Sequence, residues 1–258
     1  YQTRTFSPFS GFWSIESKDY SAKLDESMAQ RVIPRHRLIK KNPQAKMSEA
    51  VEPIVYYLDA GVPEPVRGAL LDGARWWNAA FEEIGFKDAY QVKVLPADAD
   101  PMDIRYNVIQ WVHRATRGWS YGSSVLDPRT GEIIKGHVTL GSLRVRQDLL
   151  IAQGLTCAFD GDPVKLKAAK AMALDRIRQL SAHEVGHTLG IAHNFAASVN
   201  DRASVMDYPH PLATIDNKGD VVLNGAYTQG VAEWDKYVIA YGYSDFTADE
   251  AAQLARLE

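Results

Sequence analysis

Residues 183 to 193 read His-Glu-Val-Gly-His-Thr-Leu-Gly-Ile-Ala-His, and this stretch carries most of the information on fold and chemistry. On an α-helix each residue turns by about 100°, so His183 and His187 lie about 40° apart on one face. A helix continued to His193 would carry this histidine about 240° around the axis and about 9 Å beyond His187. We therefore expect the helix to stop near Gly190, because glycine takes the left-handed conformation past a helix end without steric cost.

Three converging histidines predict a metal site of a particular kind. Neutral imidazoles from His183, His187 and His193 would fill three positions around a zinc ion and leave the fourth for water, as in catalytic zinc sites. Zinc lowers the pKa of such a water from about 15.7 to roughly 7. Glu184 is badly placed to bind the same ion but can reach the water and accept its proton as general base. A chance helical pattern explains the short motif of two histidines, and it explains the long form with Gly190 and His193 less well.

A second motif follows at Ser204-Val205-Met206-Asp207-Tyr208-Pro209. Together with the long histidine motif, it resembles the metzincin clan of zinc endopeptidases. The resemblance implies that Met206 forms a hydrophobic floor beneath the metal without touching it. It also implies that Tyr208 is a movable extra ligand and a hydrogen-bond donor to the developing oxyanion. A packed aromatic side chain is the alternative for Tyr208.

Other phrases extend the resemblance over the chain, namely residues 35–38, 53–57 and 183–195. They are similar to the met-zincin catalytic domain of large bacterial zinc-dependent metalloproteases. This similarity implies a piece of a larger multidomain chain, exported to the periplasm, the outer surface or the medium. Asn194 matches none of the residues that usually follow the third histidine in better-known metzincins, so their substrate rules are not transferred.

The expected fold class is α+β, with a metzincin-like zincin catalytic domain. It comprises a twisted mixed sheet, a long active-site helix and a mostly irregular C-terminal subdomain. We expect an N-terminal extension or connector over 1–50, packed on the core, and a catalytic domain over 51–258 with an upper subdomain (51–190) and a lower one (191–258). Residue patterns predict strands at 54–58, 91–95, 106–112, 119–126 and 133–140, and helices at 63–84, 143–153, from 163 to the metal motif, and 231–241.

Two further local patterns have both a functional and a structural interpretation. Residues 127–131 suit a hairpin turn, and the resemblance places the preceding strand at the antiparallel edge of the sheet. The stretch from Tyr121 to Ser124 could then hold a substrate backbone, or simply be a protected edge. The aromatic residues of 1–50, such as Phe12 and Trp13, are more typical of hairpins that clamp a core than of a ligand-stacking platform. His210 is either polar surface or part of the cleft.

Composition excludes several classes of function. The chain has 258 residues, a net charge of −3 and 46% hydrophobic residues, which suits a globular enzyme. We expect no nucleic-acid partner, because the basic residues between Arg31 and Lys46 suit a solvated connector. No apolar run approaches the ~18 residues of a membrane span. Cys157 is the single cysteine, so no internal disulfide can form. Calcium is a weaker possibility at acidic turns, where ordinary turn chemistry serves equally well (Asp160, Asp162, Asp216, Asn217, Asp220).

The sequence thus predicts a zinc-dependent endopeptidase with peptide or protein substrates. Two alternatives remain open. One is a zinc amidase acting on small or cell-wall substrates, because the same zinc and carboxylate would serve it. The other is a non-catalytic peptide-binding module, which the intact Glu184 disfavours.

Overall fold

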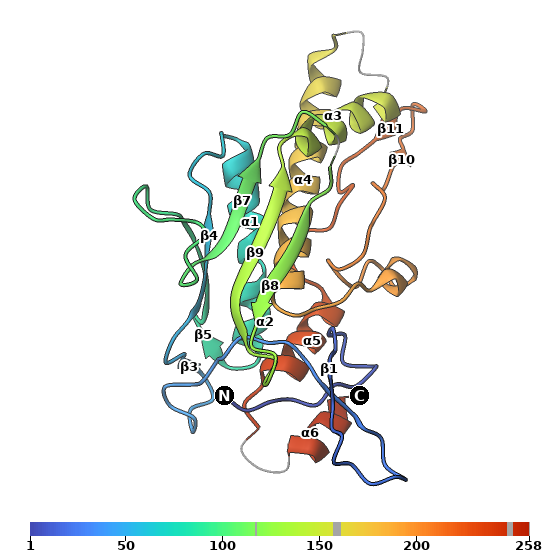
Figure 1. Ribbon diagram of the computed structural model, residues 1–258. Coiled ribbons are helices and arrows are strands. Elements are labelled where there is room, and N and C mark those ends of the chain that lie inside the picture. The colour runs from blue at the N-terminus through green and yellow to red at the C-terminus, as the bar shows by residue number, and fades with distance from the viewer. Residues whose placement is uncertain (117, 157–160, 247–249, 258) are drawn as a thin grey trace.

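The computed structural model describes residues 1–116, 118–156, 161–246 and 250–257. Its centre is a five-stranded mixed sheet with the strand order β6-β4-β7-β9-β8. Two helices, α1 (Val66–Arg75) and α4 (Pro163–Thr188), lie behind this sheet in Figure 1 and cover the same face of it. The α+β class and the mixed sheet predicted from the sequence are confirmed. The strands are β4 (Ile54–Leu58), β6 (Tyr90–Val94), β7 (Asn107–Val112), β8 (Tyr121–Leu126) and β9 (Ile133–Gly141).

The sheet is parallel except at one edge. β4 pairs in parallel with β6 and β7, and β7 pairs in parallel with β9. β8 pairs antiparallel with β9, with Gly122 opposite Val138, and stands last in the strand order. The expected antiparallel edge strand is therefore present, and α4 packs against it.

The first helical region differs from the single helix expected over 63–84. It forms α1 (Val66–Arg75) and α2 (Trp77–Glu83), separated at Trp76. The backbone of Trp76 keeps right-handed helical angles, but its N–H donates to Gly73 O, three residues back rather than four. Gly73 lies against the backbone of Arg178 on α4, where an added Cβ would come within 2.0 Å of Arg178 O. The helix pair ends at Gly85, whose φ of +86° suits glycine.

The long helix α4 (Pro163–Thr188) carries the first two histidines. Asp162 caps its N-terminus by accepting hydrogen bonds from the N–H groups of Val164 and Lys165, as the Asp-Pro pair predicts. The helix ends two residues before Gly190, which has a φ of +101°. An added Cβ at Gly190 would lie 2.1 Å from Pro34 O. The helix stop predicted at Gly190 is therefore confirmed. The last helix before it, α3 (Leu143–Thr156), packs on α4.

The N-terminal residues reach the end of α4 from the opposite end of the chain. Trp13 N donates to Gly190 O and Ala192 N donates to Gly11 O, both at 2.9 Å, so residues 11–13 pair with 190–192. The ring of Phe12 is buried and lies close to both Gly190 and Gly242. The remaining short strands are the hairpin β1 (Ile15–Lys18) and β2 (Ala29–Val32), and the parallel pair β3 (Ser48–Glu49) and β5 (Phe86–Lys87).

The prediction that the basic residues between Arg31 and Lys46 are all solvated is wrong for one of them. Arg35 is only 7% exposed. Its guanidinium donates to Gln2 O at 2.7 Å and lies over the ring of Tyr1. Pairing with a distant backbone oxygen and an aromatic face makes this cation part of the packed structure.

The chain after α4 is mostly irregular until its last two helices, as expected. Short elements interrupt it, and α5 closes the core through Val238 and Ile239. Among the described residues, no helix combines the length and apolarity needed to cross a membrane. The domain boundaries at 50 and 190 stay a prediction. These elements are a 3₁₀ helix (Phe195–Val199), β10 (Thr214–Ile215), β11 (Val221–Val222), α5 (Glu233–Tyr243) and α6 (Glu250–Leu257).

Candidate metal centre

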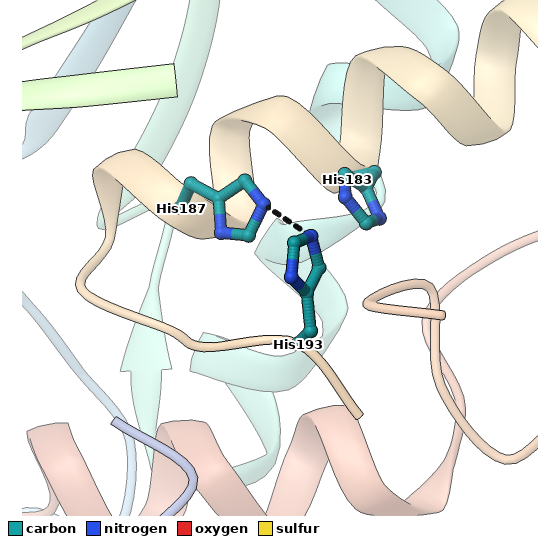
Figure 2. Close-up of side chains that lie close together, drawn as sticks. All are labelled: His183, His187 and His193. Atoms are coloured by element: carbon teal, nitrogen blue, oxygen red, sulfur yellow. Dashed lines mark hydrogen bonds between the residues drawn. The ribbon is translucent and has the colours of Figure 1, made fainter. Parts of the chain in front are cut away.

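Three histidine rings meet at the end of α4. His183 and His187 project from its last two turns, and His193 reaches back to them from the loop that follows (Figure 2). One ring nitrogen from each histidine lies within 4.8 Å of the others. The Nε2 atoms of His187 and His193 are 3.1 Å apart. The structure therefore brings together the three residues predicted as metal ligands.

Backbone carbonyls orient two of the rings. His183 Nδ1 lies 2.8 Å from Val205 O, and His187 Nδ1 lies 2.9 Å from Ile191 O. A carbonyl oxygen only accepts, so Nδ1 carries the proton in each ring and Nε2 keeps its lone pair for a metal. Burial lowers the pKa of His183 to about 3 and that of His187 to about 4, which keeps both imidazoles neutral.

The arrangement fits a zinc ion. Two nitrogens about 2.1 Å from a tetrahedral zinc lie roughly 3.4 Å from each other, close to the separation of His187 and His193. Neutral Nε2 donors that converge on one point are also the donor set zinc prefers. His183, His187 and His193 could thus hold one such ion.

The segment containing Met206 is held under the histidines by a buried carboxylate. Asp235, on α5, accepts hydrogen bonds from Ser204 Oγ at 2.7 Å, Val205 N at 3.0 Å and Ala232 N at 2.8 Å. This fixes Val205, whose carbonyl orients His183. Burial raises the pKa of Asp235 to about 6 despite these hydrogen bonds.

Met206 itself is fully buried and packs on the helix between the two histidines. An added Cβ at Gly186 would lie 2.3 Å from Met206 Sδ and 2.8 Å from Trp77 Cζ2. Only glycine at this position lets Met206 come so close to the helix. The histidine motif therefore contains both the candidate metal ligands and the glycine that leaves space for Met206.

Glu184 is buried beside the histidine cluster, at 5% exposure. Burial raises its pKa to about 7, while the nearby charge of Arg176 and a hydrogen bond from the Gly122 N–H lower it. Gly122 lies on the edge strand β8, where an added Cβ would come within 2.2 Å of Glu184 O. The edge strand β8 thus packs closely against α4 at Glu184. A carboxyl with a pKa near neutrality can both take up and release a proton.

Tyr208 lies at the same site but is 58% exposed. Its ring is 4.6 Å from that of His193 and 5.2 Å from that of His183, measured between centroids. Burial raises the pKa of Tyr208, with a further contribution from the charge of Glu184. Its hydroxyl therefore stays protonated at neutral pH and can donate a hydrogen bond.

An open cavity of about 720 Å³ adjoins these side chains. Both Glu184 and Tyr208 line it, whereas none of the three clustered histidines does. His210 lines it as well, together with Pro209 and Pro211, which favours the cleft interpretation of this histidine. A second hollow of about 810 Å³ is lined by residues from β4 and β9 and includes neither Glu184 nor Tyr208.

Sequence reasoning missed several parts of this site. Trp13 lies with its ring 6.1 Å from that of His187 and 6.4 Å from that of His193, although we expected the N-terminal aromatics only to clamp the core. Arg176 lines the cavity from inside α4. The carbonyls of Val205 and Ile191 have no signal in the side-chain pattern, because every residue has one.

In the described part of the chain, no cluster of acidic side chains supports a calcium site. There, the histidine trio is the one group of three or more His, Cys, Asp or Glu side chains close enough to share an ion. Asp162 caps α4, and Asp216 accepts from the N–H groups of Lys218 and Asp220 within its own turn. Asp160 and Cys157 lie outside the described residues.

Comparison with known proteins agrees with this geometry. Residues 165–258 match the family described as Met-zincin, a stretch that contains all three histidines, Glu184, Met206 and Tyr208. The resemblance to metzincins is thereby confirmed over this stretch of the chain. Among solved structures the chain is similar to that of myroilysin, with 15% identity, a TM-score of 0.34, and coverage of 74% of this chain and 93% of that chain. No curated protein matched.

Proposed function

We propose that this protein is a zinc-dependent endopeptidase in which His183, His187 and His193 hold the ion and Glu184 is the general base. The observation that carries the proposal is the convergence of three neutral imidazoles within 4.8 Å, beside a buried carboxylate and an open cavity. The Met-zincin match over the same residues supports it.

Each side chain then has a definite part in the reaction. Bound zinc would polarise the scissile carbonyl and acidify a water molecule. Glu184 takes a proton from that water as it attacks the carbonyl carbon, and later donates the proton to the leaving amine. Tyr208 donates a hydrogen bond to the carbonyl oxygen as it gains charge, a contribution of about 3–4 kcal/mol for one such donor in other enzymes.

The edge strand is the proposed support for the substrate backbone. β8 pairs with β9 on one side, and among the residues that the structure describes no strand pairs with its other side. An extended peptide added there would lie along α4 and pass Glu184, because Gly122 of this strand packs directly against the backbone of Glu184. A long bound peptide favours cleavage within a chain rather than release of terminal residues.

A peptide library tests the proposal. We expect the purified, zinc-loaded protein to cut a proteome-derived library at internal bonds mapped by mass spectrometry. Chelated protein and the variant Glu184→Ala should give no cuts. Glu233→Gln is a matched carboxylate control, because the side chain of Glu233 is 85% exposed and lies outside the cavity.

The same experiment separates the alternatives. Cleavage limited to small amides would favour the amidase. If zinc-loaded protein cut no peptide while it and Glu184→Gln bound peptides equally well, the non-catalytic module would replace the endopeptidase.

A further inference from the structure

The cavity beside Glu184 is unusual in its charge. Three arginines line it, namely Arg114, Arg144 and Arg176, whereas Glu184 is the one carboxylate among the lining residues that the structure describes. The remaining lining is largely apolar or small, including Leu180, Tyr227 and Pro211. The three arginines differ in how far their charge is already matched.

The charge of Arg144 is largely neutralised by Asp148 on the same helix. Its guanidinium donates to both carboxylate oxygens of Asp148, at 2.7 and 3.1 Å, and Asp148 is fully buried. Arg114 lies at a more open position, where its Nη1 donates to Trp119 O. Neither arginine therefore offers a buried, unmatched charge to a ligand.

Arg176 is different, because it is only 8% exposed and has no carboxylate within salt-bridge distance among the described residues. Its Nη1 donates to the amide oxygen of Gln179, and its guanidinium lies 5.7 Å from the ring centre of Tyr227. A neutral amide and an aromatic face do not cancel a full charge, and the carboxylates of Asp148 and Glu184 attract it from beyond salt-bridge distance. A buried guanidinium of this kind is a strong attractor for an anion that enters the cavity.

The position of Arg176 relates this charge to the reaction. It lies on α4 two turns before His183, and its charge is felt by both Glu184 and Tyr208. A substrate side chain in the cavity would thus come from a residue next to the bond that the water activated by Glu184 attacks. Arg144, which Asp148 holds in place, lines the same cavity.

We propose that this cavity receives the carboxylate side chain of an aspartate or glutamate next to the cleaved bond, and that Arg176 recognises it. The inference rests on the proposed endopeptidase function and adds its substrate class. A guanidinium pairs with a carboxylate through two parallel hydrogen bonds, which a neutral amide cannot match.

The test compares pairs of peptides that differ at one residue. Each pair carries Asp and Asn, or Glu and Gln, immediately before or immediately after a cleavable bond, and kcat/KM is measured with zinc-loaded protein. In wild type we expect at least a tenfold preference for the acid at one of the two positions, as follows from the strength of hydrogen bonds to charged groups. This comparison needs no variant.

Variants then assign the preference to Arg176. Arg176→Met should bring the ratio of acid to amide close to one, and Arg176→Lys should keep part of it. Arg178→Met is the matched control on the same helix, because Arg178 pairs with Asp175 and Asp72 and does not line the cavity. It should keep the wild-type ratio. Circular dichroism and melting temperature show whether each variant is folded.

The outcomes distinguish the inference from the function on which it rests. Efficient cleavage with equal rates for acid and amide peptides overturns the inference and leaves the endopeptidase intact. If no peptide is cut, the endopeptidase fails, and the inference is judged by calorimetric binding to zinc-loaded Glu184→Gln protein. Tighter binding of the acidic peptide that is lost in Glu184→Gln/Arg176→Met would support it, and equal binding of both peptides would overturn it.

Discussion

The substitution Gly186→Ala tests how tightly the active-site helix is packed on Met206. In an unconstrained helix, replacing glycine by alanine stabilises a protein by about 0.5–1 kcal/mol. Here the new methyl would lie 2.3 Å from Met206 Sδ and 2.8 Å from Trp77 Cζ2, too close for either atom. Trp77 cannot easily move, because it is fully buried and its Nε1 donates to Ala182 O at 2.8 Å.

The expected magnitude follows from these two effects. Overpacking a filled core costs about 1–3 kcal/mol, which outweighs the gain in helix propensity. We therefore expect Gly186→Ala to lower the free energy of unfolding by about 1–2 kcal/mol. Met206 must shift, and with it the adjacent Val205 carbonyl that orients His183. Loss of such an orienting group typically weakens metal binding by about tenfold or more.

The assay uses a second glycine as its control. Gly154 lies in helix α3, where an added Cβ would meet no neighbouring atom within 4 Å. Gly154→Ala should therefore raise the free energy of unfolding by about 0.5 kcal/mol. Urea denaturation gives both free energies, and competition with a chromophoric chelator gives zinc affinity. If Gly186→Ala were as stable as Gly154→Ala and bound zinc as tightly as wild type, the packing argument would be refuted.

Three further predictions concern other parts of the structure. The pKa of Asp235 is raised to about 6 by burial, so the folded state holds this proton more tightly than the unfolded chain does. Its contribution to stability is present below about pH 4 and is lost as the pH rises through about 6, and Asp235→Asn should abolish about 3 kcal/mol of this pH dependence in urea unfolding. Equal pH dependence in wild type and variant would contradict this. Phe12→Ala empties a site in the core and should cost about 3–5 kcal/mol, whereas a loss below about 1 kcal/mol would show that the N-terminal segment contributes little. Removing zinc with a chelator should lower the free energy of unfolding by about 2.7 kcal/mol relative to protein at a free zinc concentration of about 100 times Kd, and an unchanged melting temperature would argue against a zinc site.

Local patterns predicted the parts of the fold that depend on local causes. The stop at Gly190 follows from the conformational freedom of glycine, and the start at Asp162 from hydrogen bonding within one helical turn. The histidine spacing likewise identifies residues that one helix face brings together. These features were therefore readable before any tertiary contact was known.

The rest depends on contacts between distant residues. Trp13 approaches His187 across most of the chain, and nothing in its own neighbourhood indicates this. The break at Trp76 accompanies the packing of Gly73 on α4, which the periodicity of the helix does not reveal. Arg176 belongs to a helix whose other buried residues are mostly apolar, and its importance appears only once the cavity wall is assembled.

The pairing of residues 11–13 with residues 190–192 separates the ligands of this centre from the support that holds them. All three clustered histidines fall within the stretch from 165 to 258, whereas the segment that pairs with the path to His193 comes from the first fifteen residues. A fragment of residues 165–258 would keep all three histidines. It would lack residues 11–13, however, and would leave His193 on a loop without this backbone pairing. Anyone who transplants this centre to another scaffold would have to supply that short strand as well.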